Sequence, residues 1–192
     1  ASGRSLRGVR PAVFLVLVLL AGCSGGGDSS SLSAPASTPD VTICTPTGTA
    51  QADADLPAVA LIPEAIAALE QQLGGAQQYF EVNATARLVN LFVALNNATV
   101  AQAWVYVDGQ LTSKEGQAAS GGTFTAADLD LRPDSVLSKV RDQIPEAILE
   151  TFYVHGDGTG KVEYGVLTSA QCGGGLDVVV GADGSVKSVD PV

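Results

Sequence analysis

Two Asp-Gly pairs, Asp108–Gly109 and Asp183–Gly184, each lie between two runs of alternating apolar and polar residues. A two-residue turn of type I′ needs a positive φ at both central positions, and Asp-Gly supplies it at little steric cost. Alternation with a period of two is typical of a strand that buries one face. Both pairs therefore predict β-hairpins, and consecutive hairpins predict an antiparallel sheet.

Similar alternation predicts strands through most of the chain. In the first of them, Phe80 and Val82 alternate with polar residues, so we expect their side chains to share the buried face. The predicted strands are 78–85, 87–95, 100–107, 148–155, 161–167, 176–180 and 185–189.

Two segments carry apolar residues at the spacing of a helix. Residues 57–73 place apolar side chains three and four positions apart, with Pro63 suited to a first turn and Gly74–Gly75 as a stop. Residues 133–144 have the same spacing, and Pro145 ends this second predicted helix.

The two halves of the chain resemble each other. WVYVDGQLTS (104–113) is similar to VVGADGSVKS (179–188), and IAALEQQL (66–73) is similar to LSKVRDQI (137–144). The offsets of 75 and 71 residues predict a duplicated unit of one helix followed by three or four antiparallel strands. Chance similarity between two amphipathic helices and two Asp-Gly hairpins is the alternative.

These elements predict an α+β fold, with helices packed on one face of an antiparallel sheet or of two related sheets. We expect a body at 44–192, with a first repeat at about 57–113 and a second at about 133–190. Between the repeats, residues 114–131 are polar and Gly-rich at first, which predicts a linker with a short edge strand near 123–125.

The N-terminus has the layout of a targeting segment. Arg4, Arg7 and Arg10 precede an apolar run at 12–20, which is shorter than the about 20 apolar residues that a membrane-spanning helix needs. This pattern predicts a signal peptide. A buried helix or an N-terminal membrane helix is the alternative.

Leu20-Ala21-Gly22-Cys23, directly after the apolar run, resembles the lipobox of bacterial lipoproteins. The resemblance implies a signal peptide at 1–22, acyl chains on Cys23, and attachment to the membrane or envelope of a bacterium on its extracytoplasmic face. Residues 23–43 would then be the lipidated cysteine and a Gly/Ser/Pro-rich flexible tether. A plain cleaved secretory signal, without an anchor, is the alternative.

The charge balance argues against a nucleic-acid partner. The chain has 10 basic and 20 acidic residues, and removal of the three N-terminal arginines changes the net charge from −10 to −13. Phosphate binding needs Lys and Arg, and anionic head groups repel an acidic body. We therefore expect no nucleic-acid partner, and membrane contact only through the anchor on Cys23.

Cys44 and Cys172 remain once Cys23 carries lipid. An exported chain meets oxidising conditions, so we expect these two to form a disulfide, worth about 4 to 5 kcal/mol as an upper figure. A metal site or a nucleophile is the alternative, although the chain has one histidine, His155, and no C-x-x-C motif.

The layout around LDVVVGADGSVKSV (176–189) resembles that of PepSY-type modules of secreted and membrane-attached bacterial proteins. Such modules have one amphipathic helix, a short antiparallel sheet and a last hairpin of this form. In that family they are inhibitory or chaperoning pro-segments of peptidases, or sensor and binding domains. The resemblance implies a non-enzymatic module that binds a protein or peptide partner.

A second resemblance is to lipid-carrier lipoproteins of the bacterial envelope. WVYVDGQL (104–111) and DLDLRPDSVLSKV (128–140) are similar to segments of such proteins. The family has a single curved sheet whose helices enclose an apolar cavity for acylated molecules. The resemblance implies an apolar ligand as the alternative to a protein partner.

Catalytic motifs are weak. His155 precedes GDGTGK (156–161), which lacks the glycine spacing of a phosphate loop and has Val162 where Ser or Thr would bind magnesium, so we expect a surface histidine and a hairpin loop. No serine lies in a G-x-S-x-G motif. We therefore expect no enzyme, no cofactor and no metal, and a hydrolase stays open only if two carboxylates converge in a cleft.

Two other groups of residues have a functional and a structural interpretation. Asp128, Asp130 and Asp134 could bind calcium, but they lack the EF-hand spacing, and Asp134 suits a helix N-terminus. Five aromatic residues could line an apolar cavity, although packed core is the commoner role at strand spacing. They are Tyr79, Phe80, Phe92, Trp104 and Tyr106.

Overall fold

The hairpin at Asp108–Gly109 has the predicted turn. Val107 pairs with Gln110, so Asp108 and Gly109 form the whole loop. The φ angles of Asp108 and Gly109 are +49° and +75°. The hairpin joins β3 (Val100–Val107) to β4 (Gln110–Ser113). Positive φ at both positions confirms the type I′ prediction.

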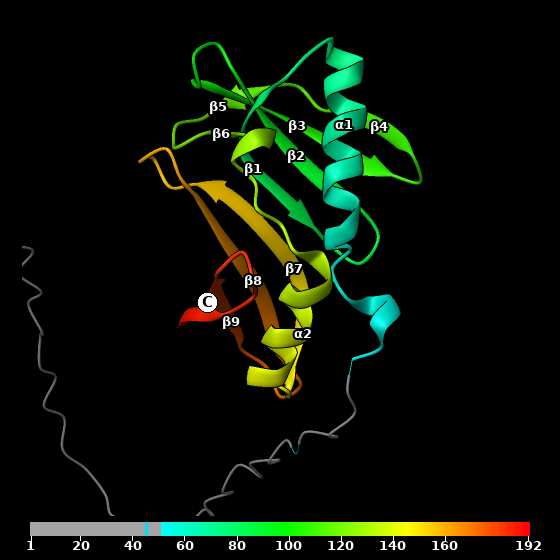
Figure 1. Ribbon diagram of the computed structural model, residues 1–192, viewed down its shortest axis with the longest axis vertical. Coiled ribbons are helices and arrows are strands. Elements are labelled where there is room, and N and C mark those ends of the chain that lie inside the picture. Colours follow the sequence, from blue (N-terminus) through cyan, green and yellow to red (C-terminus); the bar gives the residue numbers. More distant parts are fainter. Residues whose placement is uncertain (1–44, 46–50) are drawn as a thin grey trace, which may run out of the picture. The chain divides into compact units, whose positions relative to one another are not determined.

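The computed structural model describes Thr45 and residues 51–192, all of which belong to one compact unit (Figure 1). No helix within these residues is long and apolar enough to cross a membrane. Besides β3 and β4, the elements are η1 (Asp53–Asp55), η2 (Val59–Leu61), α1 (Ile62–Leu73), β1 (Gln78–Ala84), β2 (Val89–Leu95), β5 (Gln117–Ala118), β6 (Phe124–Thr125), η3 (Ala126–Asp128), α2 (Pro133–Gln143), β7 (Ala147–Gly156), β8 (Val162–Ala170), β9 (Gly175–Val180) and β10 (Val186–Pro191).

The ten strands of the described residues form one antiparallel sheet. Eight of them follow the order β10-β9-β8-β7-β1-β2-β3-β4, while β5 pairs with β3 and β6 pairs with β1. Each helix precedes a meander of four strands, and the two meanders meet where β1 pairs with β7. The predicted α+β class is confirmed, and the choice between one sheet and two is settled as one.

The two segments that resemble each other in sequence occupy corresponding places. Residues 104–113 lie in the third and fourth strands of the first meander, and 179–188 in those of the second. The second hairpin forms, but its turn is not of type I′: Gly184 has a φ of +85°, whereas Asp183 has no positive φ. The loop runs from Gly181, whose N–H donates to the Ser185 carbonyl at 2.8 Å, and a register shift follows in β10. Duplication stays a prediction.

The helices begin and end as their sequences dictate. α1 starts at Ile62, later than predicted, because Val59–Leu61 forms a 3-10 turn before Pro63 enters the first helical turn. Gly74, at φ +83°, ends it and donates its N–H to the Glu70 carbonyl. α2 starts at Pro133 as predicted and ends at Gln143.

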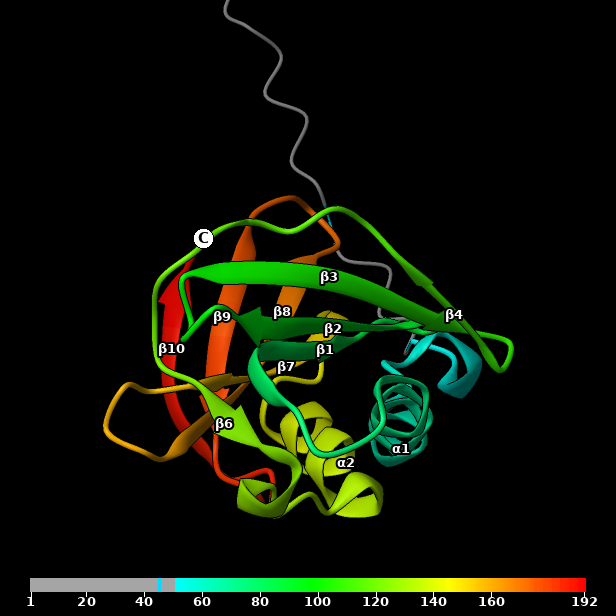
Figure 2. The ribbon, with the colours of Figure 1, turned by 90° about the horizontal axis from the view of Figure 1, so that it is seen from above.

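Both helices pack on the same side of the sheet, and one continuous core lies between them and the strands (Figure 2). Leu69 of α1, Val140 of α2, Leu91 of β2 and Phe152 of β7 all belong to this core and are fully buried. At Gly184, an added Cβ would lie 2.6 Å from the Val136 Cα, so the β9–β10 loop packs directly on α2.

A bulge in β1 corrects one prediction. The register with β2 shifts between Tyr79 and Glu81, so Tyr79, and not Phe80, shares the buried face with Val82. Phe80 is half-buried. A bulge reverses the alternation on one side of itself, and a simple period of two therefore misassigned the first residues of the strand.

The segment at 114–131 contains more structure than predicted. β5 pairs with β3, and β6, close to the predicted short strand, pairs with β1 through Tyr79 and Phe124. The rings of these two residues lie 5.8 Å apart, and both are buried. The segment therefore contributes to the core.

The β2–β3 turn places three consecutive residues in the left-handed region. Asn96, Asn97 and Ala98 have φ angles of +51°, +56° and +59°, and the Thr99 N–H closes the turn on the Leu95 carbonyl at 3.1 Å. Asn tolerates this region because its short polar side chain can form local hydrogen bonds. Ala has no such side chain, so the clash of its Cβ with the backbone is not compensated.

Ala98→Gly should stabilise the protein by about 0.5 to 1 kcal/mol, because glycine removes the clash at positive φ. Urea unfolding followed by circular dichroism measures the change. Ala94→Gly, in the extended part of the neighbouring strand β2, is the matched control and should lower the midpoint. A lower midpoint for Ala98→Gly would contradict the strain at this turn.

Candidate functional site

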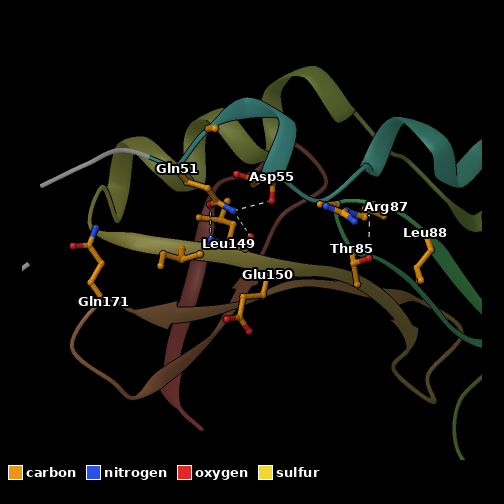
Figure 3. Close-up of a pocket in the computed structure, with 11 residues that line it drawn as sticks. Gln51, Asp55, Thr85, Arg87, Leu88, Leu149, Glu150 and Gln171 are labelled. Atoms are coloured by element: carbon orange, nitrogen blue, oxygen red, sulfur yellow. Dashed lines mark hydrogen bonds between the residues drawn. The ribbon is translucent and has the colours of Figure 1, made fainter. Parts of the chain in front are cut away.

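β7 extends beyond the end of its neighbour. Its pairing with β1 covers only Phe152 to His155, since Ala84 is the last residue of β1 and the chain then turns. Along the earlier part of β7 lies an open cleft of about 820 Å³ (Figure 3). Its lining residues are Gln51, Ala52, Asp55, Thr85, Ala86, Arg87, Leu88, Ile148, Leu149, Glu150 and Gln171.

Gln51 takes the place that a neighbouring strand would occupy in this gap. The Leu149 N–H donates to Gln51 Oε1 at 2.8 Å, and Gln51 Nε2 donates to the Leu149 carbonyl at 2.8 Å. Gln51 Nε2 also donates to the Asp55 carbonyl at 2.9 Å, as Figure 3 shows. One side-chain amide thus satisfies both backbone groups of Leu149, which would otherwise lack partners.

α2 holds the segment that carries Gln51. Arg141 Nη1 contacts Asp53 Oδ1 at 2.8 Å, and Arg141 Nη2 donates to the Gln51 carbonyl at 3.2 Å. The Asp53 side chain is 89% exposed, so the ion pair adds little to stability. Its contribution is to position residues 51–53 beside β7.

The cleft combines an apolar floor with exposed charges. Leu149 is fully buried, whereas Asp55, Arg87 and Glu150 are exposed. Within the described residues, none of these three side chains takes part in an ion pair. They are therefore available to a ligand, with one more negative than positive charge.

A second polar cluster lies on the sheet face that the helices leave uncovered. Tyr153 Oη donates to Asp177 Oδ1 at 2.7 Å, across β8. The ring can cross that strand because Gly165 lies under it, where an added Cβ would be 2.2 Å from the Tyr153 Cζ. Burial, and then the hydrogen bond to Asp177, raise the pKa of the Tyr153 hydroxyl well above its usual range.

His155 lies beside this tyrosine and has the surface position that the sequence predicted. Its ring stacks on Tyr153 at 5.4 Å, and its Nε2 lies 3.3 Å from Glu163 Oε1. Glu81 of β1 is its register partner on the other side. Among the described residues, no group of three or more His, Cys, Asp or Glu side chains could hold a metal ion.

The other residues that the sequence singled out are spread over the structure. Asp128 caps η3 by accepting bonds from the Thr125 N–H and hydroxyl, each at 2.8 Å, and these bonds lower the pKa of its carboxyl. Asp130 lies 3.8 Å from Arg132 in an exposed ion pair. The loop at 156–161 is the predicted hairpin loop, in which Asp157 accepts bonds from Thr159 and Lys161.

Two predicted site residues, Cys23 and Cys44, lie outside the described residues. Cys172 lies in the turn between β8 and β9, next to Gln171 of the cleft. The disulfide between Cys44 and Cys172 stays a prediction.

Three of the five aromatic residues that could line a cavity belong to the packed core. Tyr79, Trp104 and Tyr106 are at least nine-tenths buried, whereas Phe80 and Phe92 are half-buried. Trp104 Nε1 is buried and has no hydrogen-bond partner among the described residues. Packing of large side chains therefore occupies the space under α1.

Two tyrosines attach α1 to the sheet. Tyr106 of β3 donates a hydrogen bond to Glu64, and Tyr79 of β1 donates one to Glu70 at 3.3 Å. Burial, with Glu70 as the second cause, raises the pKa of Tyr79 above its usual range. Beside the helix lies a small groove of about 360 Å³, which is lined by Pro63, Ile66, Ala67, Glu70, Ala126, Leu129 and Leu131.

Gly165→Ala should destabilise the protein by about 1 to 3 kcal/mol, because its methyl group would displace the Tyr153 ring. In a Tyr153→Val background the same change should cost far less, since the ring is gone. Urea midpoints of the four proteins give this double-mutant cycle. An equal cost in both backgrounds would show that Gly165 is required for another reason.

No protein-family model matches this chain, and no curated protein matches it. Among solved structures, the chain is similar to the crystal structure of a "putative lipoprotein" from Clostridium difficile 630. The TM-score is 0.49 at 12% identity, and the match covers 74% of this chain and 97% of that one. A likeness of this size carries no information about ligand or activity.

Proposed function

We propose that this chain is an exported, lipid-anchored lipoprotein of a bacterial envelope, and that its α+β body is a non-enzymatic module for binding a protein or peptide partner. The anchor rests on the sequence Leu20-Ala21-Gly22-Cys23 and on the tether that follows it. The binding role rests on the body, whose resemblance to PepSY-type modules implies such a partner.

One observation supports surface binding above all. Buried side chains occupy the space between the helices and the sheet, whereas the edge of β7 before Phe152 has no neighbouring strand among the described residues: the Gln51 side chain occupies that place, beside exposed charges. A packed interior stabilises the fold and leaves the surface to make the contacts. An open strand edge is a common docking place for extended segments of other proteins.

Cys23→Ser should abolish lipidation and release the protein from the membrane or stall its processing, because the thiol is the proposed site of acylation. Partition between membrane and soluble fractions, with globomycin treatment of the wild type as the control, measures the effect. Unchanged membrane partition of the variant would contradict the anchor.

A lipid or glycolipid carrier is the second candidate function. The single continuous sheet with both helices on one face is the architecture that the carrier resemblance implies, and the groove beside α1 is mainly apolar. A carrier would need to open the packed core to admit an acyl chain.

One pair of measurements on the soluble form that begins after Cys23 separates the two functions. We expect a protein partner in pull-downs from native envelopes and a clean apo mass in native mass spectrometry. Copurifying acyl species without a protein partner would favour the carrier. Absence of any partner for both the soluble and the anchored forms would argue against the binding module.

A further inference from the structure

β7 differs from the other interior strands, because before Phe152 it has no neighbouring strand on the side of β1 within the described part of the chain. Both backbone groups of Leu149 bond to a side chain, Gln51, and not to a strand. A side-chain amide carries the same donor and acceptor as a peptide group, so an incoming backbone could replace it bond for bond. The side chain can rotate away, whereas a paired strand cannot leave without unfolding the sheet.

We propose that this edge binds an extended, basic segment of a partner protein, which adds to β7 as a strand and displaces the Gln51 amide. The inference rests on the proposed binding function and deepens it, because it names the surface and the chemistry of the partner. Addition of a strand gives affinity through main-chain bonds and specificity through alternate side chains.

The cleft has the extent that such a segment needs. It follows β7 from Gln171 at one end to Leu88 at the other, as Figure 3 shows, with a volume of about 820 Å³. Ile148, which is half-buried, supplies apolar surface in it, above the buried Leu149. An extended chain advances about 3.3 Å per residue and presents side chains alternately to opposite faces, so alternate residues would meet this surface.

Charge selects a basic occupant. Asp55 and Glu150 are exposed on the cleft and free of ion pairs within the described residues, against one arginine, Arg87. The whole chain carries a net charge of −10, which attracts cations over longer distances. Lys or Arg on the outward face of the added strand would meet Glu150.

The probe is a short fluorescein-labelled peptide of alternating valine and lysine, with its termini blocked. We expect saturable binding to the full chain in fluorescence anisotropy. A peptide of the same sequence with N-methylated backbone amides should not bind, because it cannot pair with β7. A peptide of alternating valine and glutamate should bind much more weakly. Equal binding of the N-methylated peptide would overturn strand addition.

Two variants test the residues. Glu150→Lys should weaken binding of the basic peptide about fivefold at low salt, whereas Glu115→Lys, the same change at an exposed position outside the cleft, should leave it nearly unchanged. Gln51→Ala should tighten binding about fivefold, because the peptide no longer competes with the amide. Equal effects of the two charge reversals, or unchanged affinity in Gln51→Ala, would overturn the site.

Hydrogen exchange at the Leu149 amide in Gln51→Ala, which lacks the side chain that bonds this N–H, identifies other occupants. Slow exchange of this amide in the variant, without peptide and at every protein concentration, would mean that this chain's own residues 46–50 fill the gap. Slow exchange only at high concentration would mean a second copy. Either result overturns the proposal.

A last comparison separates this site from the broader function. An envelope protein captured equally by the wild type and by Glu150→Lys would overturn the β7 site and leave the binding module standing. Loss of the same protein in Glu150→Lys, together with peptide binding, supports the site. Capture of nothing by either form counts against the binding function itself.

Discussion

Four residue pairs between β1 and β7, from Glu81 with His155 to Ala84 with Phe152, join two meanders into one sheet. Without them each meander would have an open edge, and the core that both helices share would be split. The paired residues are distant in sequence, so their contact requires closure of a long loop, whereas each meander forms through local hairpins. The junction is short, so the part of β7 before Phe152 has the Gln51 side chain beside it in place of a strand.

Most of the fold could be predicted from interactions between residues that are close together in the chain. The turn at Asp108–Gly109, the helix stop at Gly74 and the alternation in β2 depend on neighbours in the chain, so the sequence reveals them. The bulge at Tyr79 and the pairing of β1 with β7 depend on partners far away in sequence. Alternation alone identifies strands, but it specifies neither their neighbours nor a shift in register.

The candidate site was less accessible to prediction. Gln51 stands in a segment without periodicity, and only the end of β1 next to a longer β7 gives its amide a structural role. Gly165 is one of 22 glycines, and its importance comes from a tyrosine on another strand. His155 was assigned correctly as a surface residue because a glycine-rich turn follows it, but its stacking on Tyr153 had no sequence signal.

Trp104 provides an optical reporter within the helix-covered face. It is the only tryptophan in the chain, it is 8% exposed, and its indole N–H lacks an acceptor among the described residues. Indole emission moves to longer wavelengths when water or another acceptor reaches the ring. A change in the packing of α1 on β3 would therefore alter the fluorescence of one known residue, and the movement of this helix can be followed in solution without a label.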